Sequence, residues 1–159
     1  MPVSSAEFKR TLGTFATGVT IVTIKNPQGI HGLTVNSFTS VSLNPPLILI
    51  CIQKEGTSHQ QMVATDAFVV NILSATQREL AERFARSDLG SQARFDKVKY
   101  KLNKRGIPIL EDNLATLECR IVDQFEGGDH TIFLAEVENT WAAEDKPALV
   151  YYRRNYYEL

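Results

Sequence analysis

The apolar positions along this chain predict strands more often than helices. Runs rich in β-branched residues, at residues 19–24 and 67–73, are typical of strands. Two longer runs, residues 115–125 and 131–141, are joined by a turn with two glycines, which favours a long hairpin. We expect the remaining strands at residues 31–43, 47–52 and 148–153.

Turn signals connect these strands into hairpins. The sequence Asn26-Pro27-Gln28-Gly29 is expected to fold residues 19–24 back onto the strand that begins at His31. Asn44-Pro45-Pro46 ends that strand before residues 47–52 begin. Direct strand-to-strand connections favour an antiparallel sheet over alternating βα units.

The first helix is predicted near the N-terminus. Ser4 and Glu7 have the spacing of a capping box, in which each side chain bonds the backbone N–H of the other residue. Gly18 is expected to end the helix. The apolar stripe of the helix would consist of Phe8, Leu12 and Phe15.

Two further helices are expected to be shorter. Ser58 is the expected N-cap of a helix that runs to Val63. Thr76 and Glu79 have the spacing of a second capping box, which would open a helix over residues 77–85. The apolar stripe of that helix would consist of Leu80 and Phe84.

The expected elements add up to six or seven strands and two or three helices. Residues 86–108 are charged and weakly periodic, so we expect a long loop with one short helical turn, and long loops are often functional lids. The fold class is mainly β (α+β), in a single domain over residues 1–159. A small antiparallel barrel with flanking helices is favoured because a barrel removes exposed strand edges.

Composition and charge exclude several classes of function. A formal net charge of −1 over 159 residues gives no electrostatic reason to expect nucleic acid or an anionic membrane as a partner. No apolar run approaches the roughly 20 residues of a membrane helix, and the first ten residues lack the apolar core of a signal peptide. We therefore expect a cytoplasmic protein.

The cysteines and histidines form no metal or nucleophile motif. Cys51 and Cys119 lie in apolar, strand-like runs and are interpreted as reduced, buried thiols. His31, His59 and His130 lie too far apart along the chain to form a local metal-binding motif. The chain has no P-loop, GxGxxG or GxSxG sequence, and we predict no metal site.

Residues 32–43 contain no charged residue, and their polar side chains are all short. A strand that only covers a core would alternate apolar residues with long charged ones. A neutral face of hydroxyls and an amide can lie close against a flat heterocycle such as flavin. The alternative is an ordinary exposed strand face, because threonine is a good strand former. The polar residues concerned are Thr34, Asn36, Ser37, Thr39, Ser40 and Ser42.

Four motifs lie in order along the chain. They are FATGVTIVT at residues 15–23, HGLTVNSF at residues 31–38, SLxPP at residues 42–46 and GDHT at residues 128–131. Together they resemble the flavin reductase-like family over essentially the whole chain. The resemblance is closest to the small reductase components of two-component flavin monooxygenases, which hydroxylate phenol or 4-hydroxyphenylacetate.

This resemblance implies both a fold and an activity. The fold would be an antiparallel Greek-key split β-barrel of the FMN-binding type. The activity would be that of an NADH:flavin oxidoreductase, a homodimer that passes reduced flavin to a separate aromatic-hydroxylating oxygenase component. FAD is preferred by resemblance, with FMN as the other option. NADH is preferred over NADPH because no arginine cluster for a 2′-phosphate is evident.

The resemblance places the flavin along the strand from Thr34 to Ser40. Polar groups of Thr34, Val35, Asn36 and Ser37 would bond the polar edge of the flavin ring, and Ser40 would lie toward the ribityl chain.

Residues after the next strand are candidates for the flavin phosphate. Lys54, Ser58 and His59 follow residues 47–52, and a helix N-terminus at Ser58 would offer free N–H groups to an anion. The alternative for Lys54 and His59 is an ordinary solvated turn.

Two other parts of the chain are implied to touch the cofactors. The corner of Phe84, Ala85, Arg86 and Ser87 would contact the flavin, although a cation such as Arg86 is also common at a helix C-terminus. By resemblance His130 faces the nicotinamide or the flavin edge, and it is our candidate catalytic residue. Its alternative is an exposed hairpin histidine.

The C-terminal aromatic residues have two interpretations. Tyr151, Tyr152 and Arg153 would close over the nicotinamide, or they would belong to a terminal strand that packs on the barrel. Together with Tyr156 and Tyr157 they could instead form a dimer interface.

Two competing functions stay open at the level of sequence. A carrier or sensor that binds flavin or haem without catalysis would share the fold, and it would show no steady NADH oxidation. An amine oxidase similar to the pyridoxamine-phosphate oxidases would need a cationic site for its substrate's phosphate, and the sparse basic residues near residues 32–43 disfavour it.

Overall fold

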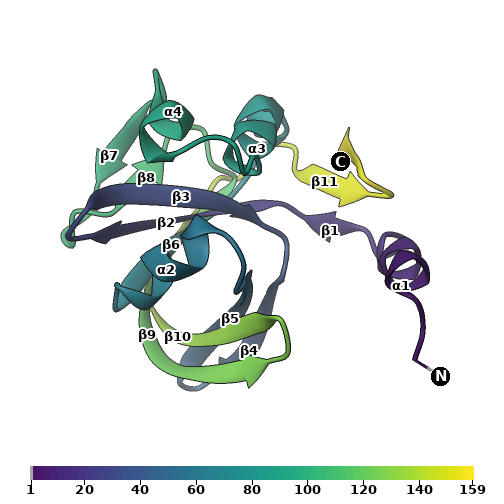
Figure 1. The fold of residues 1–159 in the computed structure, drawn as a ribbon. Helices are drawn as coiled ribbons and strands as arrows, with labels where there is room; N and C mark the ends of the chain where they lie inside the picture. Colours follow the sequence, from purple (N-terminus) through teal and green to yellow (C-terminus); the bar gives the residue numbers. More distant parts are fainter. Residues whose placement is uncertain (1) are drawn as a thin grey trace.

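Seven antiparallel strands form a strongly curled sheet in the computed structural model, which describes residues 2–159 (Figure 1). In spatial order they are β3 (Gly29–Val35), β2 (Thr20–Asn26), β6 (Ala67–Ile72), β9 (Ala115–Gly127), β10 (His130–Ala142), β5 (Pro46–Gln53) and β4 (Phe38–Leu43). The two edge strands, β3 and β4, are consecutive along the chain and are separated only by Asn36 and Ser37. The sheet therefore has to curl until its edges meet. Within residues 2–159 no hydrogen-bonded ladder joins β3 to β4, so the barrel is not closed.

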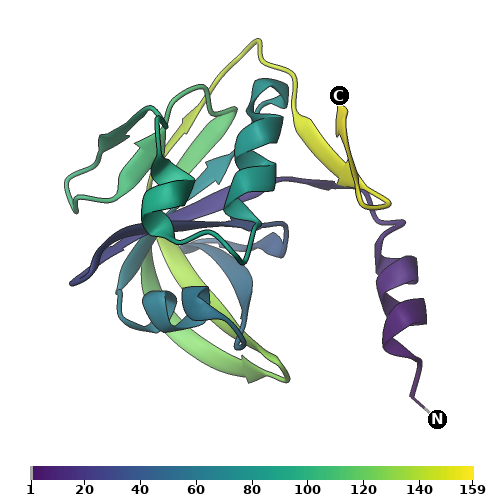
Figure 2. The same ribbon diagram turned by 45° about the horizontal axis from the view of Figure 1, so that its top comes forward.

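Two small sheets and four helices surround the curled sheet. The strands are β1 (Thr17–Gly18), β11 (Leu149–Tyr152) and β12 (Asn155–Glu158) in one sheet, and β7 (Tyr100–Leu102) and β8 (Pro108–Leu110) in the other. The helices are α1 (Ser5–Leu12), α2 (Thr57–Val63), α3 (Arg78–Phe84) and α4 (Ser91–Phe95), with a 3₁₀ turn at Ala75–Gln77. Helices α2, α3 and α4 pack on β3, whereas α1 stands apart beside β11 (Figures 1 and 2).

Strand β2 is buried on both faces, which explains its run of β-branched residues. Val22 and Ile24 belong to the core cluster inside the curl, together with Phe68, Phe133 and, from α2, Met62. The other face of β2 packs against α3, α4 and the C-terminal strands. That second cluster contains Val19, Ile21, Leu73, Ala81, Phe84, Phe95, Leu110 and Leu149.

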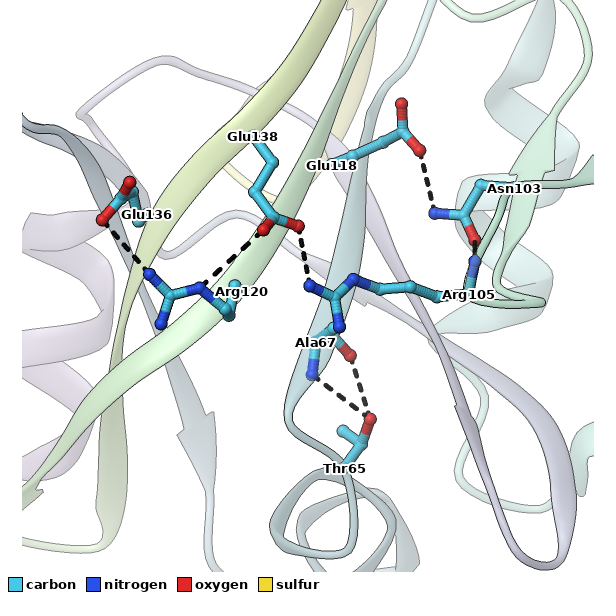
Figure 3. A network of polar contacts seen from close by, with 8 residues as sticks. All are labelled: Thr65, Ala67, Asn103, Arg105, Glu118, Arg120, Glu136 and Glu138. Carbon is cyan, nitrogen blue, oxygen red and sulfur yellow. Dashed lines mark hydrogen bonds and ion pairs between the residues drawn. The ribbon is translucent and has the colours of Figure 1, made fainter.

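A network of polar side chains fastens the segment between β7 and β8 onto the main sheet (Figure 3). Glu138 on β10 accepts a hydrogen bond of 2.9 Å from Arg105 and lies 3.8 Å from the Nε atom of Arg120. Asn103 donates to Glu118 on β9 at 2.9 Å. The two arginines are therefore paired with glutamates of β10, and the Glu118 carboxylate is held by an amide.

The prediction of a mainly antiparallel β protein with flanking helices is confirmed, as are the long hairpin and the strands near residues 19–24, 47–52 and 67–73. The strand expected over residues 31–43 is wrong as one element, because the chain turns a corner at Asn36 and Ser37 to pass from one sheet edge to the other.

The two shorter helices are found close to where they were predicted, at Thr57–Val63 and Arg78–Phe84, but their predicted caps are wrong. Gly56, not Ser58, is the N-cap of α2, and the hydroxyl of Ser58 bonds a histidine instead. The capping box belongs to Ser74 and Gln77, which precede the predicted pair Thr76 and Glu79 by two residues. The buried hydroxyl of Ser74 also donates to the carbonyl of Asp112 at 2.7 Å.

The first helix is capped as predicted but is shorter. Ser4 accepts from the backbone N–H of Glu7 at 3.2 Å, and the helix ends at Leu12 rather than near Gly18. Its predicted apolar stripe does not reach the core of this chain: Phe8, Leu12 and Phe15 are 50%, 56% and 75% exposed.

The segment expected to be one long loop contains more structure than predicted. The helical turn is confirmed as α4, but the hairpin of β7 and β8 was not expected, and neither was β12 at the C-terminus. These strands are only three or four residues long, which is too short for a recognisable period. Among residues 2–159, no helix combines the length and apolar character that crossing a membrane would require.

Candidate cofactor-binding site

The corner between β3 and β4 forms one wall of a cleft of about 430 Å³. The other walls come from the end of β5, the turn that leads into α2, and the end of α3. His130 and Arg94 complete the lining. The full set is Leu33, Thr34, Val35, Asn36, Ser37, Cys51, Ile52, Gln53, Glu55, Gly56, Thr57, Ser58, Phe84, Ala85, Ser87, Arg94 and His130.

Side chains of the corner hold neighbouring elements in place. Ser37 donates to the carbonyl of Cys51 at 2.7 Å, and the backbone N–H of Cys51 donates to the Ser37 carbonyl at 3.2 Å. Thr34 donates to the Ala81 carbonyl at 2.6 Å, which fixes α3 on β3. The amide of Asn36 is exposed at the corner. Within the neutral face predicted for residues 32–43, Thr34 and Ser37 therefore bond neighbouring backbone, whereas Asn36 is exposed.

Glycine at position 32 allows helices α3 and α4 to approach β3 closely. A Cβ atom there would lie 2.7 Å from Cε1 of Phe84 and 3.3 Å from Cζ of Phe95. The two rings pack edge to face, with centroids 5.0 Å apart. This close packing brings α4 near enough for Arg94 to reach the backbone of β3.

Arg94 is a buried cation on the lining of the cleft. Its side chain donates to the carbonyls of Gly32 (2.7 Å), Arg86 (2.7 Å) and Leu89 (3.0 Å), and the residue is 4% exposed. Burial lowers the pKa of Arg94, but a guanidinium stays charged in proteins. The nearby Asp88 pairs with Arg86 at 2.6 Å. Among residues 2–159, no carboxylate forms an ion pair with Arg94.

His31 lies behind the cleft and is 2% exposed. Its Nδ1 atom is 2.6 Å from the Ser91 hydroxyl on α4, and its Nε2 atom is 2.9 Å from the Ser58 hydroxyl on α2. Burial, and secondarily the positive charge of Arg94, lowers the pKa of His31 from 6.5 to about 4. The ring is therefore neutral at neutral pH.

His130 begins β10 at the edge of the cleft. Its Nδ1 atom lies 2.7 Å from the carboxylate of Asp129, and 40% of its side chain is exposed. The hydrogen bond to His130 lowers the pKa of Asp129. The carboxylate fixes one ring nitrogen, so the ring has a defined orientation while Nε2 stays available to a ligand.

The structure brings many of the predicted site residues together on this cleft. They are Thr34, Val35, Asn36, Ser37, Ser58, Phe84, Ala85, Ser87 and His130. Tyr151 lies on a smaller cleft of about 170 Å³, which shares Thr34, Asn36 and Ala85 with the larger one. The structure therefore brings these residues together at the corner, and their contact with a cofactor stays a prediction.

Six predicted residues do not line either cleft. Lys54 pairs with Glu126, His59 bonds Thr131 at 2.8 Å, and Arg86 pairs with Asp88. Ser40 is exposed on β4, where the sheet has turned away from the corner. Tyr152 and Arg153 bond each other at 2.8 Å at the end of the C-terminal hairpin. A contact of these residues with a cofactor stays a prediction.

Several lining residues were missed by sequence reasoning. Arg94 falls in the segment expected to be a loop, and nothing local indicates that its side chain would be buried. Cys51 and Ile52 were treated as core residues of an apolar strand. The others missed are Leu33, Gln53, Glu55, Gly56 and Thr57.

Two other clefts, of about 570 and 800 Å³, lie beside the β7–β8 hairpin. Their volumes exceed that of the corner cleft, but two of the carboxylates on their lining, Glu118 and Glu138, already have partners. Glu138 is bonded by Arg105, and Glu118 is bonded by Asn103 at 2.9 Å and Asn139 at 2.6 Å. We consider the corner cleft the better cofactor site because its buried charge is unpaired.

Comparison with known proteins identifies related sequences over nearly the whole chain. A family model described as "Flavin reductase like domain" matches residues 12–159. An NADH-dependent FAD reductase from Streptomyces globisporus is 43% identical over 148 residues, which cover 91% of this chain and 81% of the relative. The reductase component of 4-nitrophenol 4-monooxygenase/4-nitrocatechol 2-monooxygenase from Rhodococcus opacus is 38% identical over 152 residues, which cover 96% of this chain and 80% of the relative.

A solved structure extends the comparison to three dimensions. The NADH:FAD oxidoreductase of Streptomyces globisporus in complex with NAD and FAD fragments matches with a TM-score of 0.90 at 38% identity. The match covers 97% of this chain and 92% of that chain. The fold and much of the sequence are therefore shared over nearly the whole length.

The lowered pKa of His31 predicts a pH dependence of stability. Between about pH 4 and pH 6.5 the unfolded chain binds a proton at His31 that the folded chain excludes, so folding is disfavoured as the pH falls through this window. Over the whole window the loss amounts to about 3 kcal/mol. The His31→Gln variant lacks this contribution. We expect the gap in free energy of unfolding between parent and variant to narrow from pH 7 to pH 4 in urea denaturation. A gap that stays constant would contradict the assignment.

Proposed function

The chain belongs to the flavin reductase-like domain family, and on that basis we propose that it is an NADH-dependent flavin reductase. Its flavin would be FAD, with FMN as the other option. The reduced flavin would pass to a separate monooxygenase component that hydroxylates an aromatic compound. The observation that supports this most strongly is the combination of a neutral corner and an unpaired buried cation in one cleft.

The residues of the cleft fit a flavin nucleotide. The exposed amide of Asn36 and the backbone of the corner suit the polar edge of a flavin ring. Arg94 and Ser58 provide positive charge and a hydroxyl for a phosphate. Glu55 is the one carboxylate among the described lining residues, and it is exposed. An anionic ligand therefore meets little negative charge that would repel it.

The protein's part in the reaction would be binding and orientation. A flavin held in this cleft would supply the hydride-accepting and electron-carrying chemistry. His130 is held by Asp129 at the rim, where it would orient the carboxamide of the nicotinamide. Phe84 and Ile52 would keep water away from the ring face. No acid–base step at a protein side chain is required for such a transfer.

We also infer that the active form is a homodimer. Helix α1 has eight residues and none is buried, and a helix this short is marginal without packing. A second copy that covers Phe8, Leu12 and Phe15 would stabilise it. Sedimentation at low micromolar concentration should give a dimer, and a stable, active monomer would contradict the inference.

The proposed activity predicts flavin-dependent NADH oxidation. We expect the purified protein to oxidise NADH steadily when FAD is added, and to use NADH faster than NADPH. The absorbance of NADH is followed with and without flavin. Oxidation at the same rate without flavin would contradict the proposal. Flavin binding without NADH oxidation would instead favour a carrier.

Two substitutions on the same cleft should affect different steps. Asn36→Leu should weaken flavin binding by about 1–3 kcal/mol, because a polar flavin group loses its partner.

His130→Ala should leave flavin affinity nearly intact. It should slow flavin reduction and raise the NADH concentration needed for half-maximal rate, because it removes an orienting contact. Flavin titration and stopped-flow reduction are measured on both variants. If both variants had the same flavin affinity and reduction rate, or if both matched the parent protein, the roles proposed for Asn36 and His130 would be contradicted.

A further inference from the structure

The ring of His31 joins the two helices that border the cofactor cleft. One ring nitrogen meets Ser91 of α4 at 2.6 Å, and the other meets Ser58 of α2 at 2.9 Å. Ser58 lines the cleft, whereas His31 and Ser91 do not. The hydroxyl of Ser58 is therefore the hydrogen-bonded link between the His31 ring and a ligand in the cleft.

A neutral imidazole donates from one nitrogen and accepts at the other. If the proton is on Nε2, the ring donates to the Ser58 oxygen, and Ser91 donates to Nδ1. The hydroxyl proton of Ser58 is then free to point into the cleft. If the proton is on Nδ1, Ser58 has to donate to the ring, and only its oxygen lone pairs face the cleft. The tautomer of His31 thus sets whether Ser58 is a donor or an acceptor toward a ligand.

The charge of the cleft selects between these two arrangements. Arg94 is buried on the lining and forms no ion pair among the described residues. The charge of Asp88 also acts on Arg94, but Asp88 is paired with Arg86 and does not line the cleft. The cleft therefore favours an anion. An anionic oxygen needs a donor from Ser58 and is repelled by lone pairs. On α2, the neighbouring His59 bonds Thr131 and is engaged elsewhere. His59 on α2 and Arg94 on α4 are the ionisable residues of the two helices that contact the His31 ring.

We propose that His31 is a positioning residue, which keeps its proton on Nε2 so that Ser58 donates its hydroxyl hydrogen to the phosphate of a bound flavin nucleotide. This rests on the proposed function, because it takes the ligand to be a flavin nucleotide. The bonds run in one direction, from Ser91 to His31 to Ser58 to the phosphate. The residue touches neither the flavin ring nor NADH.

The proposal is tested with a pair of ligands that differ only in a phosphate. FMN and riboflavin are titrated into the parent, His31→Leu and His31→Gln proteins. His31→Leu should weaken FMN binding by up to about tenfold, because the Ser58 hydroxyl loses the donor that orients it and its hydrogen bond to the phosphate is weakened. Riboflavin binding should change little. The Gln variant should recover much of the loss for FMN, because its amide can donate from near the position of Nε2.

A matched control separates this role from a general loss of stability. Ser74→Ala removes another buried hydroxyl, which donates to the Asp112 carbonyl at 2.7 Å away from the cleft. It should lower stability without changing FMN affinity.

Ser91→Ala should weaken FMN binding by about threefold, although Ser91 is not on the cleft lining, because the tautomer of His31 is no longer fixed.

The possible results separate the two proposals. If His31→Leu weakens FMN and riboflavin equally, or neither, the role of His31 is overturned and the proposed function is unaffected. If the parent binds no flavin at all, both are overturned. The tautomer itself is read from the ring nitrogen resonances of the parent by ¹⁵N NMR, which needs no variant to fold. A proton on Nε2 supports the proposal, and a proton on Nδ1 overturns it.

Discussion

The whole structure depends on a constraint of connectivity: strands β3 and β4 lie at opposite edges of a seven-stranded sheet but are separated by only two residues. A flat sheet cannot meet that condition, so the sheet curls until its edges adjoin. The corner is fastened by the bonds between Ser37 and Cys51. Because the ladder stops there, backbone groups and the Asn36 amide remain available, and the neutral face of the cleft is a consequence of the fold.

The second determinant is the burial of a cation beside this neutral corner. Burying a guanidinium without a carboxylate partner is costly unless its N–H groups are satisfied. Arg94 meets this condition with backbone carbonyls, which satisfy hydrogen bonds without cancelling the charge. Glycine at position 32 makes the arrangement sterically possible by letting Phe84 and Phe95 approach β3. A neutral face and a retained positive charge together suit a flavin nucleotide better than an uncharged heterocycle.

Much of the fold was predictable because β-branched runs, hairpin turns and a capping box are local signals. Val22 and Ile24, and the long β9–β10 hairpin, are examples. The residues of the corner were predicted to lie together, and they do line one cleft. The break at Asn36 was not predicted, since the strand-like pattern continues through it. Arg94 and the partners of His31 could not be predicted, because they depend on contacts with residues 62 and 60 positions away in the chain.

We propose that the flavin binds at the β3–β4 corner and not at the larger clefts beside the β7–β8 hairpin. Amide hydrogen exchange with and without FAD tests it most directly, because it reports on both regions in one experiment. We expect FAD to slow exchange in residues 34–37 and 56–58 and to leave residues 101–110 unchanged. Protection confined to residues 101–110 would contradict the account.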